Sequence, residues 1–266
     1  MANQKNLKKA DQYNDENHNY LRYWDHRQYE NQAEVIALQK LLAGKHFKLA
    51  VDVGGGYGRL STVLSDYADK VVLAEPSSQQ LDIAKDYLKD YPSIERKIMQ
   101  ADKLDFASGS VDLLAMIRVM HHLPDPTAEL ADIARVLSKN GYAIIEMANY
   151  AHFLNRIRLF IKGQKMPLTP VDIRSVEHRN KNEIPFVNHN PITVITQFNQ
   201  AGLEIEKVLS VSNLRHRIFK TLLPSKCSTL TSSKQPGNSS KCSIVKVSSN
   251  AGLVVAPFTT AGSLGI

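Results

Sequence analysis

Residues 48–58 read KLAVDVGGGYG, an apolar run that passes directly into four glycines within five positions. A short apolar run that ends in glycines is typical of a strand buried in a parallel sheet. Glycines at that point let a ligand approach the backbone closely, because no side chain stands in the way. The stretch predicts a first strand followed by a ligand-binding loop. For an isolated loop of this kind, a tight turn without a ligand is the alternative.

The alternation of short apolar runs with helical patterns continues from residue 48 to residue 149. This rhythm is typical of βαβ units and predicts an α/β fold with a mostly parallel sheet. Further strands are expected at residues 70–74, 95–100, 111–116, 142–147 and 203–211. Helices are expected at residues 59–67, 78–91, 127–137, 151–161 and 192–201.

Acidic residues follow the second and third predicted strands. Glu75 ends the second strand, where a carboxylate can accept both hydroxyl hydrogens of a ribose. Asp102 follows the third strand and could accept a bond from an adenine amino group. The pattern favours a nucleoside pocket. A nicotinamide dinucleotide fits less well, because Arg59 stands where its loop would carry a third glycine.

Four segments together resemble the motifs of class I S-adenosylmethionine-dependent methyltransferases, in particular the small-molecule group that includes the ubiquinone and menaquinone enzymes. They are DVGGGYG (52–58), VVLAEP (71–76), ADKLDFASGSVDLLAMIRVMHHLPDP (101–126) and ARVLSKNGYAIIEM (134–147). The resemblance implies a Rossmann-like, mostly parallel seven-stranded sheet flanked by helices, and S-adenosyl-L-methionine as cofactor. One departure is Asn140, where the family often has glycine. The acceptor, and the atom methylated, are not indicated.

The resemblance also implies a set of cofactor-binding residues. The loop glycines would lie beneath the methionine and ribose, with Asp52 ordering the loop, Glu75 on the ribose and Asp102 on the adenine. In the N-terminal segment, Arg27 could grip the methionine carboxylate and the Tyr23 ring could face the sulfonium. The full set is Tyr23, Arg27, Asp52, Gly54, Gly55, Gly56, Gly58, Glu75, Pro76, Ser77, Asp102, Lys103, Leu104, Arg118 and Val119.

Two adjacent histidines, His121 and His122, follow the fourth predicted strand. One of them could act as a general base toward a methyl acceptor. The alternative is that both only pack in the loop that leads to Pro124. No spacing of histidines and carboxylates in the chain indicates a metal site.

Charge and composition limit the classes of partner. The net charge of +7 over 266 residues includes four lysines between residues 225 and 266, so no concentrated basic face is indicated and no nucleic-acid partner is expected. The only two cysteines, Cys227 and Cys242, cannot staple the main fold. Neither a secretory signal nor an apolar run of membrane-spanning length is found, which favours the cytoplasm.

The sequence divides into four parts. Residues 1–46 are expected to form an N-terminal helical lid, 47–149 the cofactor-binding core, and 150–224 an acceptor-side insertion with the sixth strand. Residues 225–266 form a Ser/Thr-rich tail in which only 243–248 could supply a seventh strand. Disorder of this tail and a reading-frame change in the source gene both remain open as explanations of its composition.

Two stretches, residues 153–162 and 214–223, combine apolar with basic residues. They predict either a weak contact with a membrane surface or helices that cover the acceptor site. The expected function is methyl transfer to a small-molecule acceptor by in-line displacement. A catalytically silent S-adenosylmethionine-binding protein is the alternative, followed by an NAD-dependent oxidoreductase. The oligomeric state is not indicated.

Overall fold

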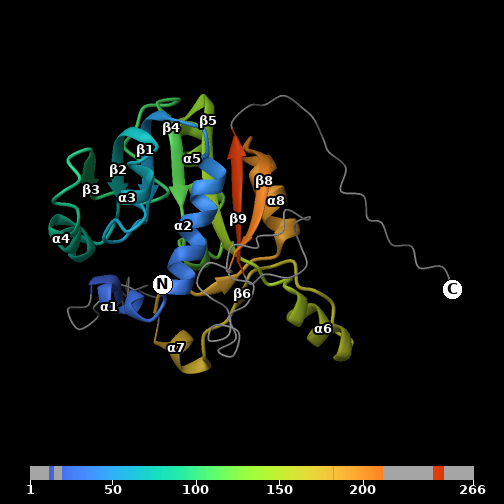
Figure 1. Cartoon of the computed structure of the whole chain (residues 1–266). Coiled ribbons are helices and arrows are strands. Elements are labelled where there is room, and N and C mark those ends of the chain that lie inside the picture. Colours follow the sequence, from blue (N-terminus) through green and yellow to red (C-terminus); the bar gives the residue numbers. More distant parts are fainter. Residues whose placement is uncertain (1–11, 15–19, 182, 212–241, 249–266) are drawn as a thin grey trace, which may run out of the picture.

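The computed structural model describes residues 12–14, 20–181, 183–211 and 242–248, and it has a central seven-stranded sheet between two layers of helices (Figure 1). The strands are β1 (Phe47–Val53), β2 (Ala68–Ala74), β3 (Ile94–Lys97), β4 (Val111–Met116), β5 (Leu137–Ala148), β8 (Glu204–Val211) and β9 (Cys242–Ser248). The α-helices are α1 (Tyr20–Asp25), α2 (Gln28–Leu42), α3 (Ser61–Leu64), α4 (Ser78–Tyr87), α5 (Thr127–Val136), α6 (Phe153–Ile161), α7 (Val176–Asn180) and α8 (Pro191–Gln200). Short 3-10 helices are η1 (Gln12–Asn14) and η2 (Met120–His122), and a small separate ribbon is formed by β6 (Val171–Asp172) and β7 (Val187–Asn188).

The strand order is β3-β2-β1-β4-β5-β9-β8, and all pairs from β3 to β5 are parallel. β9 runs antiparallel between β5 and β8, so the predicted α/β fold with a seven-stranded, mostly parallel sheet is confirmed. β9 coincides with the segment expected to supply the seventh strand. The other residues of the tail, and the apolar-basic stretch at 214–223, lie outside the described residues.

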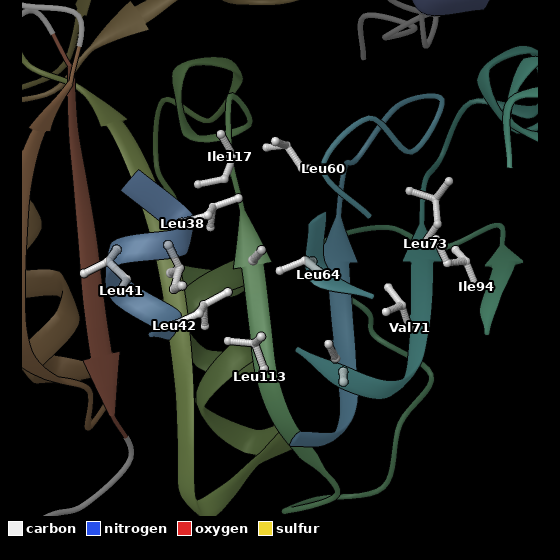
Figure 2. Packing of buried hydrophobic residues seen from close by; sticks show 14 of the residues in the cluster. Leu38, Leu41, Leu42, Leu60, Leu64, Val71, Leu73, Ile94, Leu113 and Ile117 are labelled. Carbon is white, nitrogen blue, oxygen red and sulfur yellow. The ribbon is translucent and has the colours of Figure 1, made fainter. Parts of the chain in front are cut away.

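Alternate residues of the strands pack against different helix layers. In β2, Val71 and Leu73 belong to the core beneath α2, α3 and α4, whereas Val72 and Ala74 belong to the core beneath α5 and α8. Figure 2 shows the first of these cores, where leucines of α2 lie over Leu113 of β4. Because both faces of the sheet are covered, the central strands carry continuous buried runs, such as residues 71–74 of β2 and 113–116 of β4.

Several boundaries differ from the sequence-based expectation. The helix expected at 59–67 is a single turn, α3, because a turn that bonds the N–H of Tyr67 to the carbonyl of Leu64 leads straight into β2. β5 begins at Leu137 instead of residue 142 and takes in the end of the expected helix. β6, α7 and β7 lie within residues 163–191, a polar stretch with several prolines for which no helix or strand was expected. Such two-residue strands are held by tertiary contacts and leave no periodic pattern.

The topology places one crevice at the carboxyl ends of the parallel strands. β1 pairs with β2 on one side and with β4 on the other, so the chain order reverses there. Ligands of open α/β sheets bind outside the carboxyl ends of the strands at such a switch point. The glycine loop after β1, Glu75 after β2 and Arg118 after β4 all meet at this edge.

Candidate functional site

A cavity of about 360 Å³ lies at this switch point. Its lining includes ten of the fifteen residues predicted to bind the cofactor, namely Asp52, Gly54, Gly55, Gly56, Glu75, Pro76, Ser77, Asp102, Arg118 and Val119. Five predicted residues lie outside the lining, namely Tyr23, Arg27, Gly58, Lys103 and Leu104. Leu104 is buried and its N–H donates to Asp132, so its backbone is already engaged.

The glycine loop takes a conformation that other residues rarely adopt. Gly54 and Gly56 have φ angles of 65° and 61°. At Gly54 a Cβ would lie 2.5 Å from Cγ2 of Val119, so only glycine permits the loop after β4 to come this close. At Gly56 the nearest atom to such a Cβ is Cε1 of Tyr20, at 3.5 Å. The loop therefore presents bare backbone to the cavity at Gly56.

Glu75 connects this loop to the end of β2. Its Oε2 accepts a 2.9 Å hydrogen bond from the N–H of Gly56, and its Oε1 accepts a 2.9 Å bond from the N–H of Ser77. The side chain is buried, and these two bonds fix the plane of the carboxylate. An ionised carboxylate has about four lone-pair sites, so the group can still accept bonds from a ligand.

A second buried carboxylate, Asp52, lies beneath the loop. Its Oδ2 accepts a 2.7 Å hydrogen bond from Oγ of Ser61, and a Cβ at Gly55 would collide with the same oxygen. Burial raises the pKa of Asp52 to about 6, against the opposing effect of the Ser61 bond. The carboxyl group is therefore mainly ionised at pH 7, but it titrates within reach of ordinary assay conditions.

The aromatic wall of the cavity comes from α1, through residues that the sequence interpretation did not select. Tyr20 and Trp24, four positions apart and thus on one helix face, line the cavity. Tyr23 stacks on Tyr20 with ring centroids 5.4 Å apart, and Cζ of Arg27 lies 4.0 Å from the centroid of the Tyr23 ring. The aromatic-rich segment reaches the cavity, but through Tyr20 and Trp24 and not through Tyr23.

Glu34 of α2 joins two arginines below this wall. Its Oε2 lies 2.5 Å from Nη2 of Arg59, and its Oε1 lies 3.7 Å from Nη1 of Arg118. The Arg59 guanidinium also lies 3.8 Å from the centroid of the Trp24 ring. Burial raises the pKa of Glu34, although both arginines act in the opposite direction. The N-terminal helices are thereby tied to the glycine loop and to the end of β4.

Arg118 has a strained backbone at the end of β4, with φ at 63°. Its N–H donates a 2.7 Å bond to Oε2 of Glu146, and its Nη2 donates a 2.9 Å bond to the hydroxyl of Tyr23. Burial alone would lower the pKa of Arg118, but the carboxylates of Glu146 and Glu34 outweigh it and hold the pKa above its usual value. Left-handed non-glycine residues concentrate at functional sites, where the surroundings hold them in place.

Four buried polar atoms on lining residues make no hydrogen bond with the part of the chain that the structure describes. Two are donors, Nε1 of Trp24 and Nε of Arg118, and two are acceptors, Oε1 of Gln80 and Oε2 of Glu129. Buried polar atoms normally have partners, so these four atoms are candidates for hydrogen bonds to a ligand with both donor and acceptor groups. A nucleoside that carries an amino acid, as S-adenosylmethionine does, has both kinds of group.

Tyr13 of η1 lies over the cavity. The main-chain oxygen of Tyr13 accepts a 2.8 Å bond from Oγ of Ser77, which also caps α4. At the other end, the Tyr13 hydroxyl lies 2.8 Å from Nε2 of His122. Tyr13 therefore bridges the start of α4 and η2 over the cavity.

The two predicted histidines have different surroundings. His122 lines the cavity, and its Nδ1 lies 2.9 Å from the carbonyl oxygen of Pro185. Because a carbonyl only accepts, we infer that Nδ1 carries the proton and that Nε2 accepts from Tyr13. His121 is buried outside the lining, with its ring centroid 4.3 Å from that of Phe186. Burial, followed by the neighbouring His122, holds the pKa of His121 well below its usual range.

Other lining residues were not among those predicted, although Tyr57, Ala101, Ile117 and Leu123 lie within the motif segments. The full set is Tyr13, Tyr20, Trp24, Tyr57, Arg59, Leu60, Gln80, Gln100, Ala101, Ile117, Leu123, Glu129 and Ile184. Ile184 comes from the irregular stretch before β7 and lies next to the Pro185 carbonyl that accepts from His122. The insertion between β5 and β8 thus contributes to the cavity.

Comparison with known proteins agrees with this geometry. Residues 51–145 match the family model described as a methyltransferase domain. A Dictyostelium discoideum protein named as a methyltransferase is 34% identical over 97 residues, 36% of this chain and 35% of that protein. An uncharacterized methyltransferase of Schizosaccharomyces pombe is 28% identical over 109 residues, 37% of this chain and 39% of that protein. The aligned part thus spans between a third and two fifths of these relatives.

A solved structure shares the fold over most of the chain. The S-adenosylmethionine-dependent methyltransferase of Thermotoga maritima superposes with a TM-score of 0.57 at 19% identity, covering 86% of this chain and 94% of that one. This likeness concerns the fold alone. Residues 51–145 match the methyltransferase domain, and the described sheet has the Rossmann-like arrangement of the S-adenosylmethionine-dependent methyltransferase structure.

Proposed function

We propose that the protein transfers a methyl group from S-adenosylmethionine to a small-molecule acceptor. The observation that carries the proposal is the bond from the Gly56 N–H to Glu75, which sets a carboxylate and a bare glycine backbone side by side in one cavity. A ribose needs an acceptor for its hydroxyls and an approach free of side chains, and this arrangement supplies both.

The described residues fit the cofactor in three parts. Glu75 would accept the ribose hydroxyls, and Asp52 with the loop backbone would face the amino group of the methionine. Asp102, with Pro76 and Ser77, would surround the adenine, and Glu129 adds a buried acceptor oxygen there. Lys103 and Leu104 would contribute only through the shape of the adenine loop, because they lie outside the lining.

Arg118, Val119 and the ring of Tyr20 would border the methionine end. Arg118 has an unpaired Nε that could bind a carboxylate, which gives it the role the sequence suggested for Arg27. Tyr23 and Arg27 would then support Tyr20 from behind. Aromatic faces near a sulfonium are favourable, because the ring quadrupole attracts a cation.

When bound, S-adenosylmethionine supplies a methyl group that its sulfonium already activates for displacement. The chain mainly has to align an acceptor atom in line with that bond and keep water out. His122, Leu123 and Ile184 would form the acceptor end of the cavity. Tyr13 would close it from above through its bonds to Ser77 and His122.

His122 would hold the proton that an acceptor releases. Its Nδ1 is oriented by Pro185, so Nε2 is the atom able to take a proton once Tyr13 yields its place to the acceptor. His121 would act only by packing, since it is buried against Phe186 and away from the lining.

The test is calorimetric titration of the full chain with S-adenosylmethionine, S-adenosylhomocysteine and NAD. Wild type should bind the two sulfur nucleosides and not NAD. Glu75→Gln should lower the affinity for both nucleosides at least tenfold, because a charge-assisted hydrogen bond contributes about 1.5–3 kcal/mol. The matched control is Glu177→Gln, at a side chain that is 72% exposed.

Methyl transfer is measured separately, as incorporation of labelled methyl into a small-molecule extract. Binding without transfer to any fraction would favour a silent S-adenosylmethionine-binding protein. A folded wild type that binds neither sulfur nucleoside would overturn the proposal.

A further inference from the structure

Helix α6 exposes an unusual apolar surface. Phe160 and Ile161 at its end are 87% and 75% exposed. In Figure 1 the helix projects from the body below the sheet. The other large apolar side chains that α6 exposes are Phe153, Leu154 and Ile157. Contiguous exposed apolar residues on a soluble fold mark a surface that contacts something else.

The apolar residues occupy one side of α6. At about 100° per residue they cover an arc of roughly 120°, centred opposite the two buried residues Asn155 and Leu159. Arg156 lies beyond one edge of this arc and Arg158 beyond the other. The helix therefore has a buried inner face, an apolar outer face, and basic residues along both borders.

The segment that contains this face carries charge of one sign. Residues 147–171 contain no aspartate or glutamate, but they contain Arg156, Arg158, Lys162 and Lys165. All four of these residues are exposed. Binding in the apolar groove of a protein partner would not need this excess of basic residues. An anionic lipid surface, by contrast, is complementary to the positive charge.

α6 is held firmly at its inner side and is connected to the cavity. Nδ2 of Asn155 donates to the carbonyl of Tyr150, and the N–H of Tyr150 donates to the carbonyl of His189. His189 in turn donates from Nε2 to the carbonyl of Met120, the first residue of η2. Any surface that holds α6 therefore also has a fixed orientation relative to His122.

We propose that α6 docks on an anionic lipid bilayer, lying in its surface plane with Phe160 and Ile161 inserted among the headgroups. An apolar face bordered by arginine and lysine is the arrangement of interfacial helices. The helix has nine residues, fewer than the about 20 that a bilayer crossing needs. This proposal does not depend on the reaction proposed above.

The experiment is co-sedimentation of the full chain with vesicles of phosphatidylcholine alone, or with about a third phosphatidylserine. Wild type should bind the anionic vesicles and bind less in 0.5 M salt, where charge is screened. Phe160→Ser/Ile161→Ser should lose at least tenfold in binding. Arg156→Gln/Arg158→Gln should lose about fivefold for each charge removed, which corresponds to ~1 kcal/mol per basic residue.

Two matched controls lie away from α6. Ile98→Ser removes an apolar side chain that is 69% exposed, and Lys139→Gln removes an exposed charge from β5, and both should bind like wild type. Wild type left in the supernatant, or α6 variants that bind normally, would overturn the proposal. The proposal is also overturned if the α6 variants bind vesicles like wild type but have a lower mass in light scattering. That result would mean that this face is a contact between two copies of the chain. Weak hydroxyl-radical labelling of the Phe160 side chain in the lipid-free chain would mean that another segment covers this face, and this result would overturn the proposal as well.

Discussion

The N–H of Gly56 donates a 2.9 Å hydrogen bond to Oε2 of Glu75, and this bond links the glycine loop after β1 to the carboxylate that follows β2. It fixes the glycine loop and the carboxylate relative to each other before any ligand binds. Preorganisation of this kind reduces the ordering cost that binding would otherwise carry. The pair therefore provides the clearest place to separate binding from stability.

Gly56→Ala should lower the affinity for S-adenosylhomocysteine at least tenfold. The loop requires a φ of 61° at this position, which alanine avoids. The added Cβ would also point into the space next to Tyr20. The conformational cost is about 1–2 kcal/mol, which thermal unfolding should register as a lower midpoint. Titration calorimetry measures the loss of affinity.

The control is Gly44→Ala, at a φ of 72° with nothing within 4 Å of the new Cβ. It should lower the unfolding midpoint by a similar amount and leave affinity unchanged. Equal affinities of the two variants would show that Gly56 does not face the ligand.

The sequence predicted those parts of the site that are local in the chain. The glycine loop follows its strand directly, and Glu75 ends the next strand, so strand patterns alone brought them to one edge of the sheet. The same logic found Arg118 after β4. The seven-stranded sheet was implied by the resemblance to the methyltransferase motifs, because the alternation between residues 48 and 149 accounts for five strands only.

Contacts between distant segments were beyond the sequence pattern. Tyr13 and Ser77 are hydrogen-bonded although 64 positions separate them in the sequence, and Tyr23 and Arg118 are hydrogen-bonded over a separation of 95 positions. The aromatic segment before α2 is visible in the sequence, but which of its rings face the cavity depends on how α1 packs, for instance on the contact between Trp24 and the Arg59 that Glu34 binds. Short-range periodicity carries no information about such pairings.

Asp52→Asn should stabilise the free protein at pH 8 while weakening cofactor binding. The pKa of Asp52 is raised from 3.8 to about 6 by burial, so the folded chain binds more protons than the unfolded chain between those values. Stability of the wild type should therefore rise as the pH falls from about 6 toward 4, and this contribution is absent in the variant. Denaturant unfolding of both proteins across that range is the measurement.

The affinity of the wild type for S-adenosylhomocysteine should fall as the pH falls, whereas its stability should rise. A ligand ammonium favours the ionised carboxylate, so wild-type affinity should fall as the pH drops through about 6. Asp52→Asn should bind at least tenfold more weakly at pH 8 and show a flatter profile. A wild-type affinity that is constant from pH 8 to 5 would contradict a contact between Asp52 and the amino group.

Glu34→Gln should destabilise the fold by about 3 kcal/mol, because it leaves buried arginine charge without its partner. The carboxylate is shared by Arg59 and Arg118, and all three side chains are largely buried. Glu177→Gln removes an exposed pair with Lys181 and should cost under about 0.5 kcal/mol. Urea unfolding compares them, and equal costs would mean that the cluster does not anchor the N-terminal helices.

His122→Ala should lower methyl transfer at least tenfold and leave the affinity for S-adenosylhomocysteine within twofold of wild type. The expected range for a lost general base is about 10²–10⁴ when the acceptor must give up a proton. The structural reason is that His122 lines the cavity and has its Nδ1 committed to Pro185, which leaves Nε2 as the atom that can accept that proton.

His121→Ala is the matched comparison, since the adjacent ring packs on Phe186 outside the cavity lining. It should lower the unfolding midpoint while transfer per folded molecule stays close to wild type. Added imidazole should restore part of the activity of His122→Ala and none to His121→Ala, because only the first leaves a gap that opens on the cavity. If both variants transfer methyl at the wild-type rate, neither histidine serves as the base and the pair only packs the loop after β4.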